Sequence, residues 1–161
     1  MADVERTLAR TPQMIALFSR KTGFAYPYAQ YAQVFVQDFI FGGMENTSAT
    51  TLTDTSIVDA DSEPEIWMDS LVAHELGHQW FGNLVTMQWW EGLWLKEAFA
   101  TFMETSATDA YRPDWKVWEG FAVDRSSAYH VDCLHSTRAI EFVVESPADA
   151  EGMYDVLTYE K

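Results

Sequence analysis

The chain has 161 residues, of which 48% are hydrophobic and 15% aromatic. That composition is too apolar for a disordered chain, and the length suits one domain with a single hydrophobic core. Ten basic residues against 25 acidic ones give a net charge of −15, which repels phosphate backbones and anionic membranes, so we expect neither nucleic acid nor a membrane among the partners.

The first half of the chain is expected to form one helix followed by two extended segments. Thr11 and Pro12 match an N-cap and first-turn pair, and the apolar residues after them keep helical spacing until Gly23. Apolar residues then predict a strand over 34–41, which ends at a pair of glycines, and a second extended segment over 50–53.

The second half is expected to be mainly helical. Ser62-Glu63-Pro64-Glu65 has the capping-box spacing with a proline in the first turn, so a long helix should begin there and continue to Phe81. The later elements are a β-prone segment at 84–90 and helices at 93–110, at 114–129 and from about 149. Because strands come early and helices late, we expect an α+β fold, with one domain over residues 1–161.

The long helix carries a metal-binding pattern. Residues 74–78 spell H-E-L-G-H, so His74 and His78 lie one helical turn apart on the same face and can share one ion. Imidazole nitrogens suit Zn²⁺, and a catalytic zinc site takes three protein ligands, so a third ligand must come from elsewhere. Glu97 is the candidate, because apolar neighbours would turn its carboxylate toward the first helix. We therefore predict one Zn²⁺ per chain.

Glu75 lies between the two histidines and is predicted to be the general base. It can reach a water at the metal without ligating the ion, take its proton and return that proton to the leaving amine. The alternative is that both histidines are ordinary core side chains and that Glu97 is a capped or solvated carboxylate. The three residues together on predicted helices favour the metal site.

With these residues placed, the chain closely resembles the aminopeptidase N family of gluzincins. Four motifs occur in the family's order: the upstream strand Gly42-Gly43-Met44-Glu45-Asn46, the H-E-x-x-H pattern, Trp94 to Ala100 around the glutamate ligand, and Tyr159 before a lysine. The resemblance runs from the helix at Thr11 to the last residue.

The resemblance implies a thermolysin-like fold in which a peptide substrate pairs with the strand at Gly42 to Asn46. Glu45 would then bind the free α-amine of the substrate, which places cleavage after its first residue. The hydroxyl of Tyr159 would face the oxyanion that forms when water adds to the carbonyl. From the residues alone, Glu45 would be an edge-strand charge and Tyr159 a core side chain.

The chain departs from the family pattern at several places, and one is Gly77 in the zinc helix, where alanine is common. Lys96 replaces the usual asparagine and Ala98 the usual glycine beside the glutamate ligand, and Arg138-Ala139 stands where the family has a His-Pro pair. Since Tyr159 is two residues from the last one, we also expect its helix end to fray.

Domains that accompany this segment in the family are not in the sequence, so we expect exposed surfaces and self-association. With one cysteine, no apolar run of membrane length and no signal peptide at Met1, a cytoplasmic protein is expected. The predicted partners are peptides with a free N-terminus. Two alternatives stay open: a zinc-binding but inactive scaffold, and an endopeptidase that has lost the amine-binding end wall.

Overall fold

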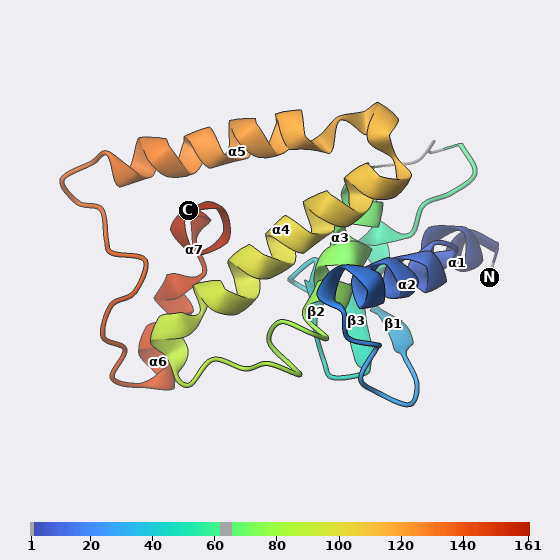
Figure 1. Ribbon diagram of the computed structural model, residues 1–161, viewed down its shortest axis with the longest axis horizontal. Coiled ribbons are helices and arrows are strands. Elements are labelled where there is room, and N and C mark those ends of the chain that lie inside the picture. The colour runs from blue at the N-terminus through green and yellow to red at the C-terminus, as the bar shows by residue number, and fades with distance from the viewer. Residues whose placement is uncertain (1, 62–65) are drawn as a thin grey trace.

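The computed structural model describes residues 2–61 and 66–161. The helices are α1 (Ala2–Leu8), α2 (Thr11–Thr22), α3 (Ile66–Gly77), α4 (Trp94–Tyr111), α5 (Val117–Asp132), α6 (Pro147–Ala150) and α7 (Val156–Glu160). The strands are β1 (Ala32–Val36), β2 (Gly43–Met44) and β3 (Ala49–Thr53). The predicted α+β class is therefore confirmed, with the small sheet early in the chain and helices over most of the rest (Figure 1). None of the helices in the described ranges is both long and apolar enough to span a membrane.

The sheet has the order β1-β3-β2, with β1 parallel and β2 antiparallel to β3. In the short β2 ladder Gly43 pairs with Leu52 and Met44 with Thr51. β2 is thus an edge strand, and the segment that follows it carries Glu45.

The predicted strand over 34–41 is too long, because β1 ends at Val36. Asp38 has a positive φ of 56°, a conformation that extended strands do not use. The chain therefore turns after Val36, and the side chains of Ile40 and Phe41 are left 86% and 61% exposed.

Residues 84–90 do not form the predicted β-prone segment, apart from one isolated bridge between Phe81 and Val85. The backbone N–H groups of residues 83–85 instead donate to the carbonyl groups of residues 78–80, at 3.0 to 3.3 Å. This turn pairs the backbone carbonyls of the residues that directly follow α3. Gly82, with a φ of +127°, makes the reversal possible.

The predicted helices are found, with shifted ends. α2 ends at Thr22 before Gly23, which has a φ of 70°, as its sequence pattern predicts. Thr11, however, is the first residue of α2 and not its N-cap. Its hydroxyl lies 2.9 Å from the side-chain oxygen of Gln33 and does not cap the helix. α5 starts three residues later than expected, after a short 3-10 turn at Pro113–Trp115. The capping box at 62–65 lies outside the described residues.

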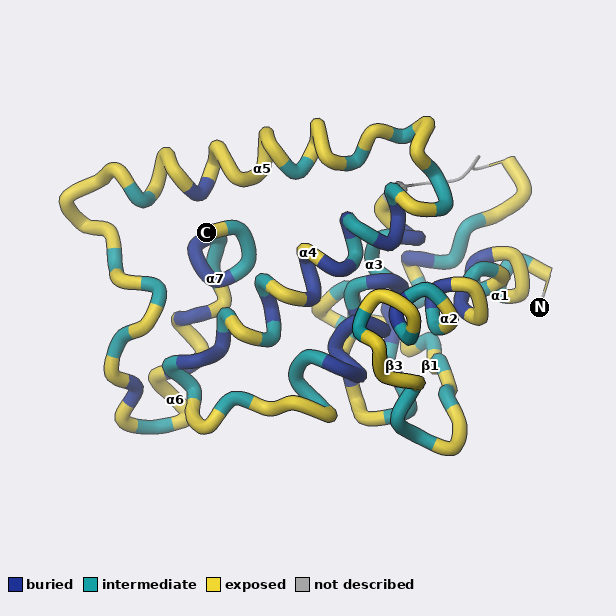
Figure 2. The backbone as a smooth tube through the Cα atoms, viewed as in Figure 1, coloured by how far each residue is buried: buried dark blue, intermediate teal, exposed yellow. Residues whose placement is uncertain are grey.

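The main core lies between the sheet, α2, α3 and α4 (Figure 2). Its buried members come from every one of these elements: Met14, Phe18, Leu52, Met68, Val72, Leu76, Met103 and Ala107, together with Trp80 after α3. Burying such side chains contributes about 1.5–3 kcal/mol each, so this cluster fixes how α3 and α4 cross. That crossing brings the histidines of α3 to the first turns of α4.

A second buried cluster attaches the last part of the chain. Leu93, just before α4, packs with Val144, Ala150 and Met153. This contact places α6 beside the beginning of α4, and α7 follows it in the chain and packs against α4 and α5 (Figure 1).

Candidate active site

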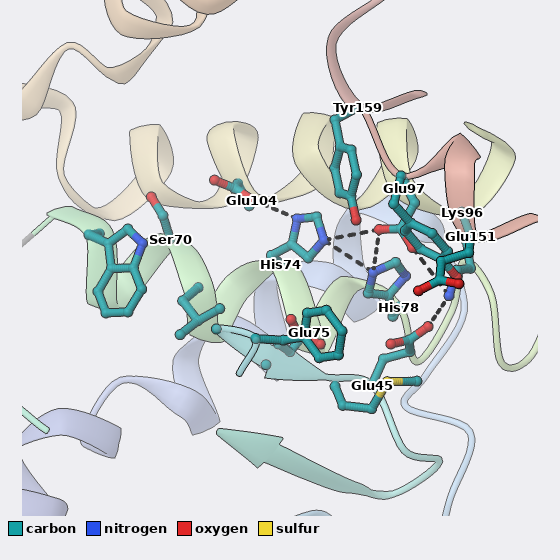
Figure 3. Close-up of a pocket in the computed structure, with 17 residues that line it drawn as sticks. Glu45, Ser70, His74, Glu75, His78, Lys96, Glu97, Glu104, Glu151 and Tyr159 are labelled. Atoms are coloured by element: carbon teal, nitrogen blue, oxygen red, sulfur yellow. Dashed lines mark hydrogen bonds and ion pairs between the residues drawn. The ribbon is translucent and has the colours of Figure 1, made fainter. Parts of the chain in front are cut away.

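A cavity of about 670 Å³ opens between β2, α3, the start of α4 and the C-terminal segment. The residues from the four motifs meet in it (Figure 3). Its lining includes Gly42, Gly43, Met44, Glu45, His74, Glu75, His78, Glu97 and Tyr159. Asn46 is the one predicted site residue outside this lining, and its side-chain oxygen accepts a hydrogen bond from Thr51 at 2.9 Å.

The three predicted metal ligands converge on one point. The Nε2 atoms of His74 and His78 are 3.1 Å apart, and Glu97 Oε2 lies 3.5 Å from the first and 3.3 Å from the second. An ion bound tetrahedrally at about 2.0–2.1 Å requires ligand atoms separated by about 3.3–3.4 Å. The spacing of the trio therefore fits a zinc ion without rearrangement.

The outer nitrogen of each imidazole is hydrogen-bonded. Glu104 Oε2 lies 2.7 Å from His74 Nδ1, and the carbonyl of Phe81 lies 3.1 Å from His78 Nδ1. Since both partners are acceptors, each Nδ1 donates, and the Nε2 atom of each ring faces the Glu97 carboxylate. With both Nε2 atoms deprotonated, the trio offers three lone pairs that one cation can bridge, which is a second reason why the donor set fits a metal.

Glu104 was missed by the sequence reasoning. It stands seven residues after Glu97, two helical turns along the same face of α4, and that spacing is the signal that could have found it. Burial lowers the pKa of His74 in the metal-free chain, but the hydrogen bonds that His74 donates to the Glu104 and Glu97 carboxylates outweigh burial and raise it to about 10. Burial raises the pKa of Glu97, but its hydrogen bonds with the two histidines outweigh burial and hold this pKa below the usual range.

Glu75 lies beside the trio rather than in it. Its side chain is buried against β2, where a Cβ on Gly43 would be 2.5 Å from the carboxyl carbon. Its Oε2 atom is buried and has no hydrogen-bond partner among the described residues. Burial raises the pKa of Glu75, partly offset by His74, to about 8. A carboxyl group whose pKa lies near neutral pH and that stands beside a metal site is suited to proton transfer.

Glu45 is held at one end of the cavity. Its backbone carbonyl accepts hydrogen bonds from the side chains of Asn83, at 2.8 Å, and Gln79, at 3.3 Å. Its carboxylate is paired with Lys96. Burial would raise the pKa of Glu45, but His78 and Lys96 outweigh it and lower the pKa. Glu45 is therefore an ionised carboxylate that faces the cavity.

Tyr159 reaches over the trio from α7. Its ring stacks near His74, with centroids 6.2 Å apart and planes at 25°, and its hydroxyl points toward Glu97 (Figure 3). Burial, followed by the negative charge of Glu97, raises the pKa of the Tyr159 phenol. The phenol thus keeps its proton and can donate a hydrogen bond.

The expected fraying around Tyr159 is wrong, because α7 is capped and packed. The Asp155 carboxylate caps the helix by accepting from the backbone N–H of Leu157 and of Thr158 at 3.0 and 3.1 Å. Arg138 binds the same carboxylate at 2.6 Å and also the Thr158 hydroxyl at 2.7 Å. The arginine that replaces the family's His-Pro pair thus fastens the helix that carries Tyr159.

Replacing Arg138 by alanine should therefore loosen α7. Hydrogen bonds to charged groups are worth about 1.5–3 kcal/mol, and the partial exposure of Asp155 reduces this, so we expect a loss of about 1–2 kcal/mol in the free energy of unfolding. Urea denaturation measures it, with the exposed Arg20→Ala as the matched control. Equal stability of the two variants would contradict the anchoring role.

Together, a largely buried trio of two histidines and a carboxylate, a glutamate beside it and an open strand edge form a candidate metal-hydrolase site. Residues 6–161 match the Peptidase family M1 domain, and the chain belongs to that family.

Named relatives agree with this assignment. The chain is 38% identical over 156 residues to aminopeptidase 2, mitochondrial, of Saccharomyces cerevisiae, which covers 94% of this chain and 16% of that protein. It is 41% identical over 130 residues to leucyl aminopeptidase of Saccharolobus solfataricus, covering 78% and 17%. It is 39% identical over 135 residues to aminopeptidase N of Lactobacillus helveticus, covering 81% and 16%. The chain thus spans about a sixth of the length of these relatives.

Proposed function

We propose that this chain is the catalytic part of a zinc-dependent aminopeptidase with a thermolysin-like core, acting on peptides with a free N-terminus. The observation that carries the proposal is the trio of His74, His78 and Glu97, whose three acceptor atoms lie 3.1 to 3.5 Å apart beside Glu75. The trio would hold one Zn²⁺, which supplies Lewis-acid polarisation of the scissile carbonyl and lowers the pKa of a water.

Glu75 moves the proton in this mechanism. Its carboxylate accepts a proton from the attacking water and then donates it to the nitrogen of the leaving amine. A carboxylate with a raised pKa holds the transferred proton more firmly, so both transfers are possible near neutral pH. Tyr159 donates a hydrogen bond to the oxygen that becomes negative as the carbonyl is attacked.

The edge of the sheet orients the substrate. Of its two sides, β2 uses one for pairing with β3, so a peptide can add as a further strand along the cavity. Glu45, directly after β2, then meets the α-ammonium group and stops the peptide from extending further. This end wall is what makes the proposed activity an aminopeptidase rather than an endopeptidase activity.

The test compares two substrates, with and without a chelator. The zinc-loaded chain should hydrolyse leucine p-nitroanilide, should hydrolyse the N-acetylated anilide at least about tenfold more slowly, and should lose activity when the metal is removed, because the metal supplies the electrophile. Bound zinc without turnover of any peptide would favour the inactive scaffold. Equal cleavage of a blocked peptide and its free form would favour the endopeptidase.

Self-association also stays a proposal. Apolar side chains such as Val123 and Val143 are 66% and 83% exposed, and exposed apolar surface promotes association. Light scattering at several concentrations measures it, and a monomer at every concentration would contradict it.

A further inference from the structure

Lys96 is the one lysine or arginine among the described residues that line the cavity. Its ammonium group is paired with Glu45 Oε1, and it also lies 3.2 Å from Glu97 Oε1. All three side chains are nearly buried, with exposed fractions of 12% for Lys96, 11% for Glu45 and 4% for Glu97. Figure 3 shows Lys96 and Glu45 facing each other at one end of the cavity.

The pairing with Glu45 has a direct consequence for the amine subsite. A lysine ammonium and the α-ammonium of a peptide are the same kind of donor, and here the lysine already holds one oxygen of the Glu45 carboxylate. An arriving α-ammonium therefore meets a partly neutralised carboxylate and a second positive charge close by. Both effects weaken the attraction for a free amine, and in a buried site such effects are large.

The lysine stem is not free to swing away. A Cβ placed on Gly82 would lie 3.3 Å from Lys96 Cβ and 3.5 Å from Lys96 Cδ, so the turn at Gly82 packs against the stem. The internal ammonium thus stays beside Glu45 unless the substrate displaces it.

The contact with Glu97 has a separate effect. Lys96 binds Oε1 of Glu97, while Oε2 faces the two histidines. Lys96 thereby directs a single carboxylate oxygen at the metal position. Loss of the lysine should consequently lower zinc affinity somewhat, whatever it does to substrate binding.

We propose that Lys96 is a specificity-determining residue, whose ammonium competes with the α-ammonium of the substrate for Glu45. The inference rests on the proposed function, since it takes Glu45 as the amine-binding residue. It predicts that this chain discriminates less strongly in favour of a free amine than the same chain would with a neutral residue at this position.

Binding measured without turnover separates this inference from the proposed activity. The zinc-loaded chain and its variants are titrated with leucinamide and with N-acetyl-leucinamide at about pH 6.5, where the α-amine of leucinamide is protonated and Glu45 is ionised, and the dissociation constants are obtained by NMR. In Lys96→Met, which keeps the length of the stem without the charge, leucinamide should bind about tenfold or more tightly. Binding of N-acetyl-leucinamide should change by less than about twofold, since it carries no cation.

Two further variants provide the controls. Lys96→Arg keeps the positive charge and should retain the weak leucinamide binding of the parent. In a Glu45→Gln background, Lys96→Met should not change the preference for leucinamide, because the shared carboxylate is gone. Zinc stoichiometry, measured in each variant, shows whether the trio is still formed.

The outcomes are distinct. If Lys96→Met weakens leucinamide, or changes both ligands by the same factor, the competition is refuted and Lys96 is a structural counter-ion. If no variant distinguishes the two ligands, Glu45 is not the amine site and the inference falls with that assignment. If leucinamide binds selectively more tightly while no variant cleaves any anilide, the inference stands and the proposed catalytic function fails.

Discussion

Replacing Glu75 by glutamine is expected to lower kcat by a factor of about 10² to 10⁴ while the chain keeps its zinc. Glutamine has the size and the hydrogen-bonding capacity of glutamate but cannot accept the proton of the attacking water. The change falls outside the trio, because Glu75 contributes no atom to the convergence of His74, His78 and Glu97. Metal affinity should therefore change little.

Steady-state kinetics on leucine p-nitroanilide, together with zinc analysis of the same sample, measure this effect. The exposed Glu145→Gln is the matched control, since it makes the same chemical change at a residue that does not line the cavity, and it should keep parental kcat. A zinc-loaded Glu75→Gln variant with parental kcat would show that another group accepts the proton. A variant that has lost its zinc would instead point to Glu75 as a metal ligand.

The three predicted metal ligands could be found from the sequence, whereas most contacts around them could not. The pattern at 74–78 is local, because helical geometry alone puts two histidines one turn apart on the same face. Glu97 was predicted from its apolar context, and the structure brings it to the histidines because α3 and α4 pack together through the main core. Local periodicity and one buried carboxylate were sufficient for this part.

The contacts of Glu45, Tyr159 and Lys96 required the tertiary structure. Lys96 was visible as a departure from the family pattern, but its pairing with Glu45 joins positions 51 residues apart, on different elements. The hold of Arg138 on α7 was equally hidden, because it depends on how the chain returns after α5. Such contacts are set by packing of distant segments, which no short pattern contains.

The errors in the fold have the same origin. Apolar composition suggested a strand at 84–90, yet the backbone N–H groups of 83–85 bond the carbonyl groups of residues 78–80 in the turn after α3. The strand over 34–41 was extended through Asp38, whose positive φ is invisible to a reading based on hydrophobicity. Long helices with clear periodicity were predicted well, and irregular segments with local backbone demands were not.

Replacing His78 by alanine is expected to remove the bound zinc and, with it, the extra stability that zinc gives the chain. A metal that binds only the folded state adds about 2.7 kcal/mol when its free concentration is 100 times its dissociation constant. His78 is 1% exposed and supplies one of three ligand atoms, so its removal leaves a site with two. The parent should gain thermal stability on addition of zinc, while His78→Ala should gain none.

The alanine variant also leaves a cavity in the metal-free protein, and the experiment separates this effect from loss of the metal. Melting temperatures are measured with a chelator and with zinc for the parent, for His78→Ala and for the exposed control His135→Ala. The difference between the two conditions is the metal contribution, since the cavity is present in both. His135→Ala should keep the parental difference. If His78→Ala still binds one zinc per chain and still gains the parental stability from it, His78 is not a ligand, and the metal site must be assigned to other residues.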